Sequence, residues 1–132
     1  MPSVERIYDR PAWLSKYGQT LASREEYAAY WQRMRDEYPA ADGRGFTLTD
    51  KARGVMAHFP ESLYDKMINR GRMEYFGEAE AVFSDPDEIW YVLKGGKKKN
   101  LKEEIFTAYI KYYEDTPIVM PIDENGTVNS LY

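Results

Sequence analysis

The sequence contains no cysteine and only one histidine, His58. The chain therefore cannot form a disulfide bond, a thiolate metal site or a cysteine nucleophile, and a histidine-rich metal centre is excluded as well. No apolar run approaches the roughly 20 residues that a membrane-spanning helix needs. The first residues also lack the basic and then apolar pattern of a signal peptide. These absences favour a cytoplasmic protein with no membrane segment, no metal and no cofactor.

Several widespread catalytic motifs are missing too. The chain has no G-x-x-x-x-G-K-[ST] phosphate loop, no G-x-S-x-G nucleophile turn and no paired-histidine metal motif. Nucleotide hydrolysis of the P-loop type, serine-hydrolase chemistry and zinc-dependent proteolysis therefore find no support in the sequence.

Size and charge set further bounds. The 132 residues, 43% of them hydrophobic, suffice for a single domain with its own core. The formal net charge of −4 is unfavourable for nucleic-acid binding, because phosphate contacts normally come from a basic face. Positive charge is nevertheless concentrated around Gly95-Gly96, where Lys97 and Lys98 stand among five lysines. This cluster is either a solvated loop or a patch that contacts substrate phosphates.

Helical patterns fill the first two-thirds of the chain. Ser23 followed by Glu26 is the capping-box pattern of a helix start, and an apolar stripe continues to Tyr38 before Pro39 ends it. Apolar spacing predicts four shorter helices, over residues 11–18, 49–59, 63–71 and 73–84.

The pattern changes to β-strands from residue 88. Runs rich in β-branched and aromatic residues predict strands over residues 88–93, 105–113, 117–122 and 127–132, with Asn125-Gly126 as a hairpin turn. We therefore predict an α+β fold in which N-terminal helices pack on a C-terminal four-stranded antiparallel meander. Residues 1–132 form one domain, with 1–50 as a helical extension and 51–132 as the core.

One predicted strand carries residues suited to RNA cleavage. Cleavage without a metal needs a base for the 2′-hydroxyl, an acid for the departing oxygen and cations that stabilise the phosphorane. Alternation along residues 105–113 places Thr107, Tyr109, Lys111 and Tyr113 on one face, and Ser130 follows on the last strand. The structural alternative is a solvated lysine among half-buried tyrosines.

The helical region supplies further candidates. His58 lies beside an apolar stripe, and its near-neutral pKa would suit proton transfer. Arg70 and Arg72 flank a helix end at Gly71, where they could clamp a phosphate or complement the helix dipole.

Short motifs in the second half of the chain support a family resemblance. Asp-Pro-Asp-Glu-Ile-Trp at residues 85–90, Tyr-Ile-Lys-Tyr at 109–112 and Ser130 resemble the pattern of the barnase, EndoU, colicin and RelE-like (BECR) nuclease superfamily. The resemblance implies a metal-independent endoribonuclease toxin that cleaves RNA, with tRNA as one candidate, in the cytoplasm of a target cell. It also implies an immunity protein or a larger phage or toxin carrier chain as partner.

The resemblance leaves the general base open among His58, Arg70 and Arg72. On this reading the catalytic set is His58, Arg72, Tyr109, Lys111 and Ser130, and the substrate-binding set is Arg70, Lys97, Lys98, Thr107 and Tyr113. The alternative function is a non-catalytic protein-interaction module whose tyrosines form the interface.

Overall fold

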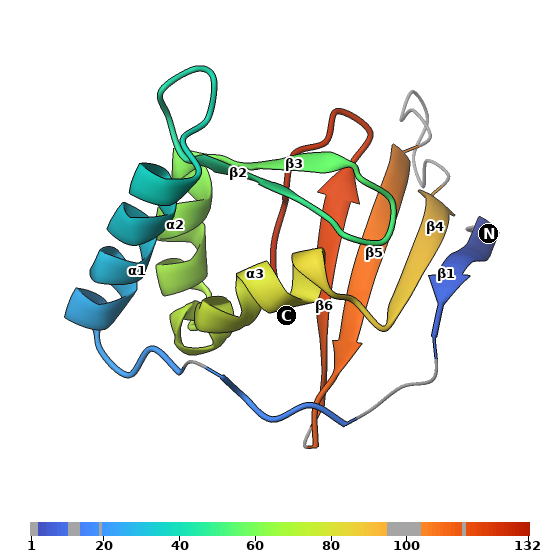
Figure 1. The fold of residues 1–132 in the computed structure, drawn as a ribbon, viewed down its shortest axis with the longest axis horizontal. Coiled ribbons are helices and arrows are strands. Elements are labelled where there is room, and N and C mark those ends of the chain that lie inside the picture. The colour runs from blue at the N-terminus through green and yellow to red at the C-terminus, as the bar shows by residue number, and fades with distance from the viewer. Residues whose placement is uncertain (1–2, 11–13, 19, 95–103, 115) are drawn as a thin grey trace.

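The structure, a computed structural model, describes residues 3–10, 14–18, 20–94, 104–114 and 116–132 (Figure 1). Helices and strands alternate along the chain more than the sequence pattern predicts. The elements are β1 (Ser3–Asp9), α1 (Arg24–Glu37), β2 (Phe46–Thr49), β3 (Met56–Phe59), α2 (Glu61–Asn69), the 3₁₀ helix η1 (Met73–Glu78), α3 (Ala79–Ser84), β4 (Glu88–Lys94), β5 (Glu104–Tyr112) and β6 (Pro117–Asp123).

The main sheet has four antiparallel strands in the order β1-β4-β5-β6. This confirms the α+β class and the four-stranded antiparallel sheet. The prediction of a strand over residues 127–132 is wrong, because the fourth strand is β1, which pairs with β4. Residues 127–132 instead follow β6 through scattered backbone bonds. Tyr132 exchanges two with Val119, and the Asn129 N–H donates one to the Pro121 carbonyl.

The predicted helix over residues 49–59 is also wrong. β2 and β3 form a separate two-stranded sheet there, with Phe46 opposite Phe59. Alternate residues Phe46, Leu48, Ala57 and Phe59 are buried. Asp50 closes the intervening turn, because its carboxylate accepts hydrogen bonds from the Arg53 and Gly54 N–H groups. The helix expected over residues 11–18 is absent from its described part, 14–18, which is irregular.

The longer helices agree with their sequence signals. The Ser23 side chain accepts a hydrogen bond from the Glu26 N–H, and the Glu26 carboxylate accepts one from the Ala22 N–H. The predicted cap by Ser23 is thereby confirmed, whereas Glu26 binds the N–H of Ala22 and not that of Ser23, as a complete capping box would require. The α2 helix and the η1–α3 pair occupy the predicted segments 63–71 and 73–84 within a few residues.

The first 50 residues are not a purely helical extension. They hold β1, α1 and β2, and α1 places Tyr27, Trp31 and Met34 in the same hydrophobic core as the rest of the chain.

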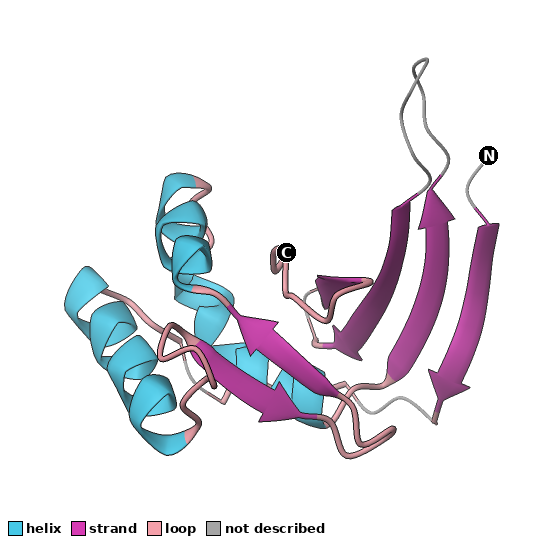
Figure 2. Ribbon diagram, turned by 90° about the horizontal axis from the view of Figure 1, so that it is seen from above, coloured by secondary structure: helices cyan, strands magenta, loops and turns pink. Residues whose placement is uncertain are grey.

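The two faces of the main sheet differ. On the inner face, Tyr109 is buried against Phe83 of α3, with ring centroids 4.7 Å apart. Figure 2 shows the helices gathered on one side of the molecule, away from the edge strand β1. We call the opposite face the open face, since its residues stay partly exposed. Its members in the centre of the sheet are Val92, Phe106, Ala108, Val119 and Pro121.

Candidate functional site

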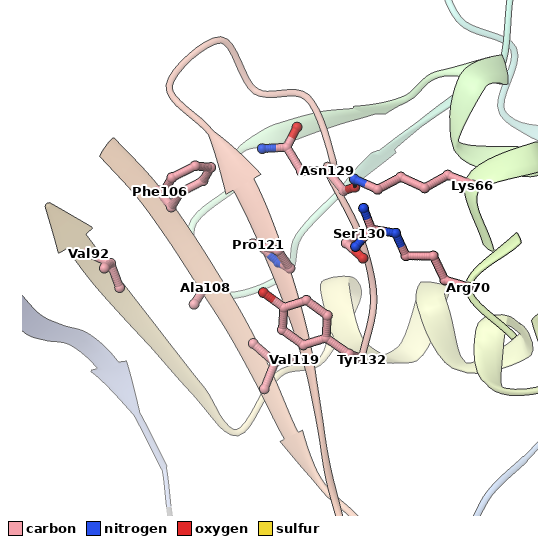
Figure 3. A pocket seen from close by; sticks show the side chains of 10 residues that line it. All are labelled: Lys66, Arg70, Val92, Phe106, Ala108, Val119, Pro121, Asn129, Ser130 and Tyr132. Atoms are coloured by element: carbon pink, nitrogen blue, oxygen red, sulfur yellow. Dashed lines mark hydrogen bonds between the residues drawn. The ribbon is translucent and has the colours of Figure 1, made fainter. Parts of the chain in front are cut away.

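A hollow of about 390 Å³ opens where α2 and residues 127–132 meet the open face. Its size falls within the roughly 300–1,000 Å³ of small-molecule sites. Figure 3 shows Lys66 and Arg70 reaching from α2 toward residues 129–130, while Tyr132 lies in front of β6. We call this site the basic hollow. Its lining comprises Lys66, Arg70, Asn129, Ser130 and Tyr132 above the five open-face residues.

The end of α2 explains why positive charge gathers here. Lys66 and Arg70 are one helical turn apart, so their side chains share a face of α2. Gly71 then adopts a φ of 66°, in the left-handed region that favours glycine, and the Arg72 N–H donates back to the Met67 carbonyl. Arg72 is thereby held close to the helix end. The negative end of the helix dipole lies at this C-terminus and favours these cations.

Two of the three cations fix residues 127–132 in place. The Lys66 Nζ atom donates to the Asn129 carbonyl at 2.6 Å, and the Arg72 Nη1 atom donates to Ser130 Oγ at 2.9 Å. The Arg72 guanidinium also lies over the Tyr132 ring, 4.8 Å from its centroid. The arrangement leaves a hydroxyl, an exposed phenol ring and three cationic groups within one small region.

The charge of this region is not balanced locally. Within the described part of the chain, Lys66, Arg70 and Arg72 make no ion pair with a carboxylate. Burial lowers the pKa of the Lys66 ammonium group below its ordinary value, and the charges of Arg70 and Arg72 lower it further. The basic hollow therefore favours an anion.

The structure brings together only some of the residues expected to act jointly. Arg72 and Ser130 are hydrogen bonded, and Arg70 lines the same hollow as Ser130. Lys111, by contrast, is buried on the inner face, where its Nζ atom donates to the Asp85 carbonyl at 2.7 Å. It also lies 3.5 Å from the Asp85 carboxylate. Lys111 and Ser130 therefore do not share a solvent-reachable site.

The tyrosines of β5 and its end have structural surroundings. Tyr109 is buried and donates a hydrogen bond to the Asp50 carboxylate. Its burial, and to a smaller extent this hydrogen bond, raise its pKa well above the ordinary value. Tyr113 is buried and stacks on Tyr17 at 4.7 Å, and burial raises its pKa strongly. Neither group can serve as a base near neutral pH.

The remaining candidates lie apart from the basic hollow. His58 is on β3, with its Nε2 atom 3.0 Å from the Arg44 carbonyl. Thr107 lines a different hollow of about 230 Å³ beside the β2–β3 turn. Lys97 and Lys98 lie outside the described residues.

Sequence reasoning did not identify Lys66, Asn129 and Tyr132 as site residues. A signal existed for Lys66, because it stands four residues before Arg70 on a predicted helix. For Tyr132 no such signal exists, since its position beside Arg72 depends on contacts between segments about 60 residues apart in sequence.

Comparison of the chain with protein-family models, with curated proteins and with solved structures finds no match in any of the three. No group of three or more histidine, aspartate or glutamate side chains is arranged to hold a metal ion among the described residues. In the same part of the chain, no helix combines the length and the apolar character needed to cross a membrane.

Proposed function

We propose that this chain binds single-stranded RNA at the basic hollow and cleaves it there without a metal ion. The observation that carries the proposal is a group of three cations with no carboxylate partner among the described residues. Lys66 and Arg70 line the basic hollow, and Arg72 is hydrogen bonded to Ser130 in its wall. Unpaired arginines are suited to phosphate, because a guanidinium offers two parallel donors to its oxygens.

The substrate class follows from the other lining residues. An RNA strand presents a phosphate, a 2′-hydroxyl and an aromatic base within each nucleotide. The basic hollow supplies cations for the phosphate, the Ser130 hydroxyl for a polar contact and the Tyr132 ring for stacking. The positive charge of the basic hollow is local, so the net charge of −4 for the whole chain does not prevent phosphate binding there.

The chemistry requires one proton to be removed and one to be supplied. In the proposed mechanism Lys66 acts as the general base that takes the proton of the 2′-hydroxyl, and the resulting oxygen attacks the neighbouring phosphorus. Arg70 and Arg72 stabilise the charge on the phosphorane. The bond from phosphorus to the 5′-oxygen breaks, and that oxygen takes a proton from the Tyr132 hydroxyl or from water. The products are a 2′,3′-cyclic phosphate and a 5′-hydroxyl end.

The test compares Lys66→Met with the native chain on single-stranded RNA in EDTA. Removal of a general base costs roughly 10²- to 10⁴-fold in rate, so we expect cleavage to fall at least about 100-fold. The exposed Lys51→Met is the matched control and retains full activity. Mass spectrometry of the native products checks for the cyclic phosphate. Equal cleavage by the Lys66 variant, or intact RNA with the native chain, overturns the proposed mechanism.

The open face favours a second candidate, a protein-interaction module. The partly exposed Val92, Phe106 and Val119 border the basic hollow, so an acidic protein with an apolar centre, such as an immunity-type partner, would fit both. In that case Lys66→Met weakens binding to the protein partner, while RNA is neither bound nor cleaved by either form.

A further inference from the structure

A second hollow lies beside Tyr132, and three tyrosines contribute to its walls. It measures about 210 Å³ and shares Tyr132 with the basic hollow. We call it the aromatic hollow. Its lining includes Tyr17, Arg72, Tyr75 and Tyr132.

Three tyrosine rings surround this space, and one of them is firmly anchored. Tyr17 stacks on the buried Tyr113 with an interplanar angle of 15°, which holds its ring in place. Tyr75, on η1, is 42% exposed and lies with its ring centroid 5.4 Å from that of Tyr17. Tyr132 is 56% exposed. Two exposed rings thus stand beside a fixed one, and a flat aromatic ligand can contact them through its π-face.

Arg72 connects the two hollows. It lines the aromatic hollow, lies over the Tyr132 ring and donates to Ser130, which lines the basic hollow. Arg70 and Arg72 stand on either side of Gly71, and each lines one of the two sites. A ligand that joins an anionic group to an aromatic group within one unit therefore fits both hollows at once. A nucleotide of single-stranded RNA is such a ligand.

We propose that the aromatic hollow receives one unpaired nucleobase of the strand whose phosphate is bound at the basic hollow. This inference rests on the proposed function and extends it, because it assigns the preference for single strands to a particular set of side chains. A base in a duplex is paired and stacked on its neighbours, so it cannot enter the hollow. The walls formed by Pro117, Ile118 and Leu131 add apolar contact around the ring.

The experiment measures binding of a fluorescent single-stranded octanucleotide with 2′-O-methyl groups, which block cleavage. An abasic strand with the same number of phosphates and the same sequence in a duplex are the comparison ligands. Stacking of one base is worth roughly tenfold in affinity or more, and we expect the base-containing strand to bind about tenfold more tightly than the abasic one.

Variants at Tyr75 test the role of the aromatic hollow itself. Tyr75→Leu is expected to remove the difference between the base-containing and abasic strands, whereas Tyr75→Trp retains it, since tryptophan keeps a π-face. Tyr91→Leu is the control, because Tyr91 is 41% exposed and lines a different hollow.

The outcomes separate the two proposals. Equal binding of the base-containing and abasic strands overturns the nucleobase assignment and leaves the basic hollow as an RNA site. An unchanged difference in Tyr75→Leu overturns the assignment in the same way. Failure of both strands to bind overturns the proposed function, and with it the inference that rests on it.

Discussion

Two clusters of charge in this molecule differ in their partners. At the start of β4, Arg10 binds Asp85 at 2.6 Å and Asp87 at 3.0 Å, and Lys111 adds a contact to Asp85. At the end of α2, Lys66, Arg70 and Arg72 make no ion pair within the described residues. Charges that are paired stabilise the fold, whereas cations without carboxylates remain available to a ligand.

The comparison also explains why Lys111 does not contribute to the candidate site. Its position on β5 suggests a phosphate contact, but Asp85 neutralises it and the inner face buries it. Arg70 is less conspicuous in the sequence, yet it is exposed beside a hollow. An exposed cation without a carboxylate partner therefore distinguishes the candidate site from a structural ion pair. The number of cations close together in the sequence does not.

The largest effect on stability should come from Asp87. This carboxylate is fully buried, binds Arg10 and accepts the Tyr112 N–H at 2.8 Å. Asp87→Ala leaves both donors without their acceptor and should lower the free energy of unfolding by about 3 kcal/mol. Urea denaturation measures this loss. The RNA affinity of the folded fraction should stay unchanged. A fall in RNA affinity without a loss of stability would contradict a purely structural role for the cluster around Asp87.

Arg70→Ala should show the reverse pattern. Its exposed side chain has no ion-pair partner among the described residues, so stability should change by less than about 0.5 kcal/mol. Loss of one phosphate contact should weaken RNA binding about tenfold and reduce the slope of log affinity against log salt by about 0.7. A salt titration of RNA binding measures both quantities. The matched control is Arg24→Ala, at the exposed start of α1. Equal losses of RNA affinity in both variants would indicate nonspecific electrostatic attraction between the chain and RNA.

The smallest effect on RNA binding and cleavage is expected for Lys111→Met. Methionine fills a similar volume, and Asp85 keeps its bond to Arg10, so stability should change by about 1 kcal/mol or less. Cleavage and binding of RNA should match the native chain. A loss of cleavage at unchanged melting temperature would place Lys111 in the active site and contradict its assignment to a structural ion pair.

Much of the fold follows from local patterns. The Ser23 cap of α1, the helix over α2 and the strands β4 to β6 are each encoded by neighbouring residues, and all are present. The helical spacing of Ala52, Val55, Met56 and Phe59 predicts a helix over residues 49–59, where the structure has the β2–β3 turn and β3. In the fold Val55 and Met56 are exposed, while Phe46 stacks on Phe59, a pairing that depends on the surrounding core.

The site is harder to predict than the fold. Arg70, Arg72 and Ser130 were recognisable as candidates, but their grouping depends on the path of residues 127–132 beside β6. The bond between Lys66 and Asn129 joins positions 63 residues apart. The burial of Tyr109 and Lys111 likewise results from packing of α3 and the hairpin on the sheet, which alternation along β5 does not reveal.

The most direct test locates bound RNA on the folded chain. Amide resonances of isotopically labelled protein are followed by NMR during titration with a non-cleavable single-stranded octanucleotide. The largest shifts are expected for residues 66–72 and 127–132, with little change at residues 85–88 and at Lys111. Shifts centred on residues 85–88 and 111, or no shifts at saturating RNA, would contradict the assignment of the RNA site to the basic hollow.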